Sequence, residues 1–175
     1  MAIYLIGYMC SGKTTLGTLL KEIADIKFTD LDQYIEECEG KSINEIFAQK
    51  GEEEFRNIEQ KALKEVTETI GGIIATGGGT PCFFDNMEYM KENGDVIYLN
   101  CSRKELFERL KIYKATRPLL KDKCDDELKE FIEMALPKRE PFYNKASIII
   151  DADPLSTEEG ARTTAKKVLE LIIKE

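Results

Sequence analysis

The sequence predicts an α/β fold, a three-layer αβα sandwich in which helices cover both faces of a five-stranded parallel sheet. Apolar runs of strand length alternate with helical patterns over the whole chain, and this alternation is typical of a parallel sheet. The segment 2–6 is continuously apolar, as expected for a strand that is buried on both faces. A length of 175 residues without a linker or internal repeat predicts one domain, 1–175.

The elements of the N-terminal half are indicated by residue spacing and by end signals. After the strand at 2–6, leucines at helical spacing predict a helix at 13–23. A shorter helix from 34 ends at Gly40, and Ser42 with Glu45 forms a capping box that opens the next one. The other elements expected here are strands at 26–28 and 72–76 and a long amphipathic helix at 52–69.

The C-terminal half continues the alternation around one charged segment. Ser102 with Glu105 caps a helix there, and Pro137 and Pro141 are expected to interrupt another. Residues 112–126 are charged, which indicates an exposed, mobile lid. The helices and strands of this half are predicted, in order, at 81–93, 95–101, 102–111, 127–145, 147–150 and 157–173.

Composition excludes several classes of protein. A net charge of −8 argues against nucleic acid or an acidic membrane as a partner. The chain has no histidine, which excludes histidine-based triads and metal sites. No apolar run approaches the roughly 18 residues that span a membrane. Five cysteines without a CxxC pair predict free thiols in a reducing compartment, hence a cytoplasmic protein, and we expect a monomer; the cysteines are Cys10, Cys38, Cys82, Cys101 and Cys124.

Residues 7–14 read Gly-Tyr-Met-Cys-Ser-Gly-Lys-Thr and match the P-loop pattern GxxxxGK[ST] between a predicted strand and a predicted helix. Backbone N–H groups of such a loop, together with the following helix N-terminus, bind phosphates. Lys13 is expected at the β- and γ-phosphates and Thr14 at Mg²⁺. The fold is therefore predicted to be of the P-loop NTPase type, binding ATP and Mg²⁺ through Cys10, Ser11, Gly12, Lys13, Thr14 and Thr15.

Two aspartates follow the second predicted strand. Strand carboxyl ends converge on the ligand site of a parallel sheet, and alternation along an extended segment would direct Asp30 and Asp32 to the same side. One carboxylate could then support Mg²⁺ while the other faces a substrate hydroxyl. The alternative interpretation is that both aspartates cap the next helix.

Three further features are informative mainly in combination. Gly77-Gly78-Gly79 after a strand lets the backbone approach a ligand closely, although a plain turn is the alternative. Arg56 stands in an acidic run and could simply pair with Glu52 and Gln60. Arg139 by itself is uninformative.

The order and spacing of these motifs resemble those of shikimate kinases along essentially the full chain. The segments that carry the resemblance are the P-loop, Asp-Leu-Asp (30–32), Ser-Ile-Asn-Glu-Ile-Phe (42–47), Glu-Phe-Arg (54–56), Gly-Gly-Gly (77–79), Arg-Pro-Leu-Leu (117–120) and Arg-Glu-Pro-Phe-Tyr (139–143). The resemblance implies transfer of the γ-phosphate of Mg-ATP to the 3-hydroxyl of shikimate, a step toward aromatic amino acids.

The resemblance also implies roles for individual residues. Lys13, Asp32 and Arg117 would be catalytic, with Asp32 accepting the hydroxyl proton and Arg117 reaching the phosphates from the lid. Thr14 would bind Mg²⁺ directly and Asp30 through water. The residues expected at shikimate are Asp32, Arg56, Gly77, Gly78, Gly79 and Arg139.

The sequence departs from the family pattern where adenine is expected. The family often has an arginine seven residues before Arg117, but Leu110 stands there and Arg109 is adjacent. We therefore expect Arg109 to contact the nucleotide. The rival interpretations are another small-metabolite or nucleotide kinase and a catalytically silent nucleotide-binding module. A GTPase is disfavoured because no DxxG motif occurs and Ser147 stands where the NKxD motif requires an aspartate.

Overall fold

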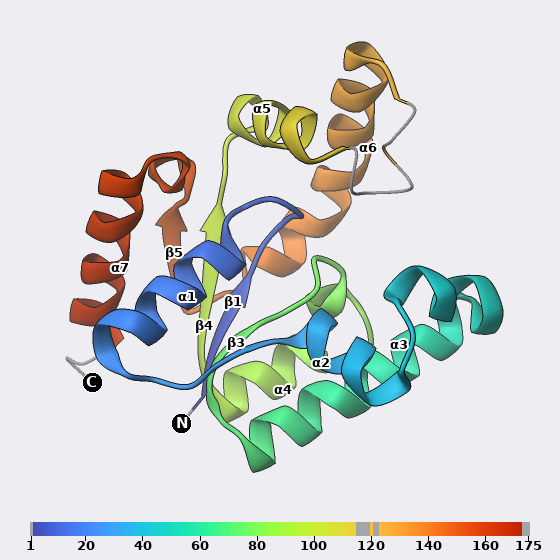
Figure 1. Cartoon of the computed structure of the whole chain (residues 1–175), viewed down its shortest axis with the longest axis horizontal. Helices are drawn as coiled ribbons and strands as arrows, with labels where there is room; N and C mark the ends of the chain where they lie inside the picture. Colours follow the sequence, from blue (N-terminus) through green and yellow to red (C-terminus); the bar gives the residue numbers. More distant parts are fainter. Residues whose placement is uncertain (1, 115–119, 121–122, 173–175) are drawn as a thin grey trace.

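The computed structural model describes residues 2–114, 120 and 123–172. Its described residues form one sheet in the order β2-β3-β1-β4-β5, and every pairing is parallel. Figure 1 shows this sheet between two groups of helices, so the predicted three-layer αβα architecture is confirmed. The strands are β1 (Ala2–Ile6), β2 (Phe28–Asp30), β3 (Gly72–Ala75), β4 (Gly94–Asn100) and β5 (Ile148–Asp151).

Helices α1 and α7 pack against each other on one face of the sheet, while α3 and α4 contact β3 and β4 on the other (Figure 1). Helices α5 and α6 pack together beyond the carboxyl ends of the strands. The helices of the described residues are α1 (Lys13–Ala24), α2 (Leu31–Glu39), α3 (Ile43–Thr69), α4 (Asn86–Asn93), α5 (Arg103–Tyr113), α6 (Asp125–Tyr143) and α7 (Glu158–Ile172), with 3₁₀ turns η1 (Thr80–Cys82) and η3 (Asp153–Ser156).

The central strand β1 is buried along its whole length. It pairs with β3 on one side and with β4 on the other, which explains its continuously apolar sequence. The described helices include none that is long and apolar enough to cross a membrane.

Some element predictions need correction. Strand β2 lies two residues later than the predicted 26–28 and ends at Asp30, and the helix predicted at 81–93 begins only at Asn86, after the 3₁₀ turn η1. The two helices predicted from 42 and at 52–69 are confirmed as the two parts of α3, which a kink at Gly51 separates (φ 80°, ψ 175°). Helix α6 continues through Pro137 and Pro141, both of which are exposed, so water can solvate the carbonyls that lose their hydrogen bonds.

The predicted lid at 112–126 lies partly outside the described residues, which omit 115–119 and 121–122. Its ends do not form a loop, because α5 continues to Tyr113 and α6 begins at Asp125. The ion pair from Lys111 Nζ to Asp125 Oδ2, at 3.1 Å, joins these two helices.

The pairing of β1 with β4 leaves no space for a side chain at Gly94. Gly94 lies opposite Ala2, and a Cβ atom at this position would overlap the Ala2 carbonyl. Replacing Gly94 with Ala is therefore expected to lower the free energy of unfolding by about 1–3 kcal/mol, measured by urea denaturation. The exposed Glu92→Ala on α4 is the control, and equal midpoints for the two variants would contradict the packing argument.

Candidate active site

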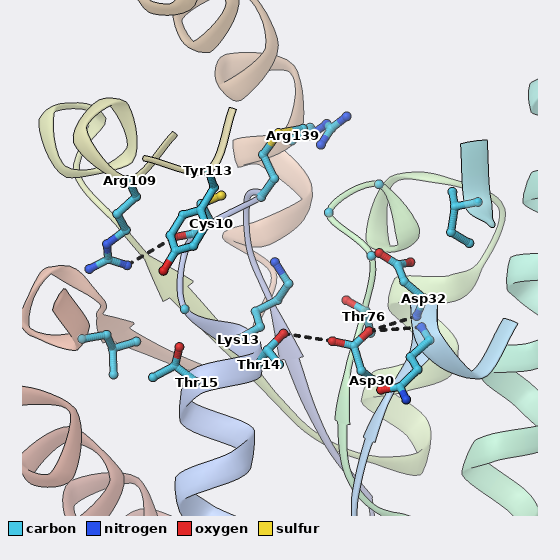
Figure 2. A pocket seen from close by; sticks show the side chains of 18 of the residues that line it. Cys10, Lys13, Thr14, Thr15, Asp30, Asp32, Thr76, Arg109, Tyr113 and Arg139 are labelled. Carbon is cyan, nitrogen blue, oxygen red and sulfur yellow. Dashed lines mark hydrogen bonds between the residues drawn. The ribbon is translucent and has the colours of Figure 1, made fainter. Parts of the chain in front are cut away.

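A cavity of about 780 Å³ lies at the carboxyl edge of the sheet. Its walls come from the P-loop, the β2–α2 junction, α3, the glycines after β3, α5 and α6. Figure 2 shows Lys13 and Thr14 on one side and the two predicted aspartates on the other. Among its lining residues are Cys10, Gly12, Lys13, Thr14, Thr15, Asp30, Asp32, Arg56, Gly77, Gly78, Gly79, Arg109 and Arg139.

The P-loop depends on two positions that require glycine. Gly12 caps α1 with a φ of 99°, and a Cβ there would lie 2.7 Å from Leu155 Cδ1. Gly7 has a φ of 144°, and its Cβ would lie 2.9 Å from both the Leu99 carbonyl and Ser11 Oγ. Residues other than glycine rarely adopt these backbone angles, so both the backbone conformation and the close packing require glycine.

Lys13 and Thr14 stand at the start of α1 and face the cavity. Lys13 Nζ donates hydrogen bonds of 2.9 Å to the carbonyls of Gly7 and Tyr8, which hold its amine at the mouth of the loop. Thr14 Oγ1 donates to Asp30 Oδ2 at 2.9 Å. The α1 N-terminus and the Lys13 amine both favour a phosphate at this position.

The Thr14 hydroxyl and the Asp30 carboxylate fit a magnesium ion. Their hydrogen bond places two hard oxygen atoms together, and Mg²⁺ usually takes only one or two protein oxygens and completes its shell with water and phosphates. No cluster of three acidic or thiol ligands exists among the described residues. An ion at this position would therefore depend on the nucleotide phosphates as well.

Asp30 and Asp32 do reach the same cavity, but the predicted extended segment between them is wrong. Asp30 is the N-cap of α2, and its Oδ1 accepts hydrogen bonds from Asp32 N at 3.2 Å and Gln33 N at 3.4 Å. Asp32 lies in the first helical turn. Capping, the alternative interpretation, is thus correct for Asp30, and it leaves Oδ2 directed toward Thr14.

The environment of Asp32 raises its pKa to about 6. Burial is the main cause and the neighbouring carboxylates of Asp30 and Glu59 add to it, while the Lys13 amine lowers the pKa. A carboxyl group with this pKa is mainly ionised at neutral pH and still accepts a proton readily. Asp32 is thereby suited to act as a base toward a hydroxyl in the cavity.

Arg56 is buried and held on several sides. Nη1 donates to Glu59 Oε2 at 2.8 Å, and Nη2 donates to Glu52 Oε1 at 3.2 Å. The pairing with Glu52 that the sequence suggested is present, whereas Gln60 instead contacts Asp85, with Gln60 Nε2 donating to Asp85 Oδ1. A Cβ at Gly79 would lie 2.8 Å from both Nη atoms of Arg56, so the absent side chain lets the guanidinium approach the backbone.

Arg139 reaches the same glycine turn from α6. A Cβ at Gly78 would lie 3.1 Å from Arg139 Nη1, and the Arg139 guanidinium lies 5.3 Å from the centre of the Tyr8 ring. The turn is further held by Tyr143, whose hydroxyl donates to the Gly78 carbonyl at 2.5 Å. No carboxylate of the described residues forms an ion pair with Arg139.

Arg109 lines the cavity but also has a structural role that the sequence did not indicate. Its Nη1 donates to the carbonyls of Cys10 and Ser11, at 3.3 and 3.1 Å. Its Nη2 donates to the carbonyls of Ala152 and Asp153, at 2.7 and 3.1 Å. Arg109 therefore connects backbone carbonyls of the P-loop to backbone carbonyls of the segment after β5.

One predicted residue stands apart from the cavity, and another lies outside the described residues. Ser11 is fully buried and does not line the cavity; its hydroxyl lies beside Gly7. Arg117 falls outside the described residues, so its role stays a prediction. Cys10 has a φ of 61°, a conformation that is uncommon for a residue other than glycine.

Glu59 also belongs to the cavity wall, although no sequence motif singled it out. It is almost fully buried, pairs with Arg56 and accepts a 2.6 Å hydrogen bond from Thr80 Oγ1. A glutamate three residues after Arg56, on the same helical face, was the available signal. Tyr143 had no comparable signal, because its partner Gly78 is 65 residues away in the sequence.

Comparisons with known proteins agree with this arrangement. A family model described as shikimate kinase matches residues 9–172. The chain is 46% identical to a shikimate kinase of Parabacteroides distasonis over 97% of this chain and 98% of that protein. It is 47% identical to a shikimate kinase of Bacteroides fragilis, over 97% and 95%.

Solved structures give the same result. A crystal structure of shikimate kinase from Bacteroides thetaiotaomicron is 45% identical with a TM-score of 0.94, covering 98% of this chain and 97% of that chain. Shikimate kinase from Acinetobacter baumannii in complex with shikimate is 34% identical with a TM-score of 0.82, covering 99% and 93%.

Replacing Asp32 with Asn is expected to stabilise the fold at pH 8 and not at pH 4. The pKa of Asp32 is raised from 3.8 to about 6 in the folded state, so ionisation above pH 6 costs folding free energy, on the order of 3 kcal/mol. This cost disappears as the pH falls through 6 toward 3.8. Thermal melting of both proteins across this range measures the difference, and a gap that does not vary with pH would contradict the raised pKa.

Proposed function

The chain belongs to the shikimate kinase family, and from this premise we propose how its residues divide the transfer of a phosphoryl group from ATP to the 3-hydroxyl of shikimate. The protein is a kinase that acts on shikimate. The observation that carries the division of roles is one continuous cavity, with Lys13 on one wall and the pair Arg56 and Arg139 on another. ATP occupies the first side and shikimate the second.

The P-loop side holds the nucleotide. Lys13 contacts the transferred phosphoryl group, and the backbone N–H groups before α1 bind the neighbouring phosphates. Thr14, with Asp30 acting through water, would hold Mg²⁺, which would supply neutralisation of phosphate charge. Cys10, Gly12 and Thr15 line the nucleotide side, and Arg109 stiffens the loop from outside through its carbonyl contacts.

The opposite side holds the acceptor. Arg56 and Arg139 bind the shikimate carboxylate, since guanidinium groups form paired hydrogen bonds with carboxylates. The glycines at 77–79 let the ring approach the backbone, where Gly78 donates its N–H. Asp32, on the wall between the two substrates, orients the 3-hydroxyl and accepts its proton as the phosphoryl group is transferred.

Arg117 is proposed to reach the phosphates from the lid at 112–126 and to stabilise charge during transfer. A closing lid would also exclude water and so limit hydrolysis of ATP. We further propose a cytoplasmic monomer that binds neither nucleic acid nor membrane. The net charge of −8 argues against nucleic acid and an acidic membrane, and the five free cysteines support a reducing, cytoplasmic location.

The first test is ADP release by the purified protein with Mg-ATP, with and without shikimate. We expect release that depends on shikimate, stops with EDTA and returns with excess Mg²⁺. Because the pKa of Asp32 is about 6, kcat/KM should fall up to about tenfold per pH unit below pH 6. ADP release with gluconate or a nucleoside monophosphate instead would refute the roles proposed for Arg56, Gly78 and Arg139 in binding shikimate. No release with any acceptor would favour a catalytically silent nucleotide-binding module.

Arg139→Ala tests the acceptor site. Arg139 forms no ion pair with the described residues, so its guanidinium can bind the shikimate carboxylate. Its loss is expected to raise the KM for shikimate about 10- to 100-fold and to leave the KM for ATP within about twofold. The exposed neighbour Lys138→Ala is the matched control, with steady-state kinetics as the measurement. Equal losses for the two substrates would remove Arg139 from the acceptor site.

A further inference from the structure

The segment between β3 and α4 places a phenylalanine ring against the guanidinium of Arg56. Arg56 Cζ lies 4.0 Å from the centroid of the Phe83 ring, closer than to Phe55 at 5.1 Å or to Phe47 at 5.8 Å. Phe55 and Phe47 line the cavity, whereas Phe83 does not. Direct contact between Phe83 and a bound acceptor is therefore not its role.

We infer that Phe83 is a positioning residue that fixes the Arg56 guanidinium for the carboxylate of the acceptor, an inference that rests on the role proposed for Arg56. An aromatic face attracts a cation through its quadrupole and favours a ring stacked on the guanidinium plane. Stacking uses the face of the guanidinium and leaves its N–H edge available. Phe83 thus contributes to acceptor binding without contacting the acceptor.

The hydrogen bonds of Arg56 alone do not fix this orientation. Nη1 is bound to the buried Glu59, but the partner of Nη2 is Glu52, whose side chain is 61% exposed. The buried Nε has no hydrogen-bond partner among the described residues. One strong contact at one end permits rotation of the guanidinium plane, and the Phe83 ring opposes that rotation.

The segment that carries Phe83 is itself held on α3. Thr80 Oγ1 donates to Glu59 Oε1 at 2.6 Å, and Asp85 Oδ1 accepts from Gln60 Nε2 at 2.7 Å. Between these anchors, Phe84 has a φ of 52°, a conformation rare for a bulky residue. Such backbone strain persists only where the surrounding structure enforces it. The strained residue directly follows Phe83, whose ring packs against Arg56.

Steady-state kinetics with shikimate and ATP separate positioning from general stability. Phe83→Leu keeps an apolar side chain and removes the aromatic face, so the KM for shikimate should rise about fivefold to tenfold. The KM for ATP and kcat should stay within about twofold, and Phe83→Tyr should restore the KM. Phe107→Leu is the matched control, because the Phe107 ring also contacts cations, Lys111 and Lys129, outside the cavity.

A double-mutant cycle with Arg56→Ala identifies the residue through which Phe83 acts. In that background Phe83→Leu should have no further effect on the KM for shikimate. Because KM does not depend on the fraction of folded enzyme, partial unfolding of Phe83→Leu leaves the test valid. An unchanged KM in Phe83→Leu, or an equal rise in both backgrounds, would overturn the inference. An unchanged KM in Arg56→Ala itself would instead refute the proposed role of Arg56.

Discussion

The parallel pairing of β1 with β3 and β4 is the constraint on which the site depends. Residues 7–14 directly follow β1, and the glycines at 77–79 begin two residues after Ala75, the last residue of β3. Ala75 is the pairing partner of Leu5 in β1. Thr76 secures this junction, since its N and Oγ1 both donate to the Leu5 carbonyl, at 3.1 and 3.3 Å. The P-loop and the turn at 77–79 are therefore held side by side by backbone pairing, which is stiffer than contacts between side chains.

The charged side chains around Asp32 act on its pKa in opposite directions. Burial beside Asp30 and Glu59 raises the pKa of Asp32, while Lys13 across the cavity lowers it. The result is a carboxylate of moderate basicity, obtained without histidine. Binding of Mg²⁺ beside Asp30 would add positive charge to the same cluster and favour the ionised form of Asp32.

Sequence patterns predicted the parts of the site that are local in the chain. The P-loop and the Asp30–Asp32 pair were found because neighbouring residues form each of them, although the helical turn at Asp32 replaced the predicted extended segment. The contacts missed are those that join distant segments. Tyr143 meets Gly78 across 65 residues, and Arg109 meets the Ser11 carbonyl across 98. No spacing rule predicts such pairs, because they depend on how α5 and α6 pack over the strand ends.

The two arginines of the acceptor side differ in a way that only the structure reveals. Arg56 is buried with two carboxylates, as a buried guanidinium requires, since an unpaired charge is costly to remove from water. Its positive charge is therefore largely compensated by Glu59 and Glu52. Arg139 has no such carboxylate among the described residues. We therefore propose that Arg139 supplies the net attraction for an anionic acceptor, and that Arg56 supplies donors that set the orientation of the acceptor relative to Asp32.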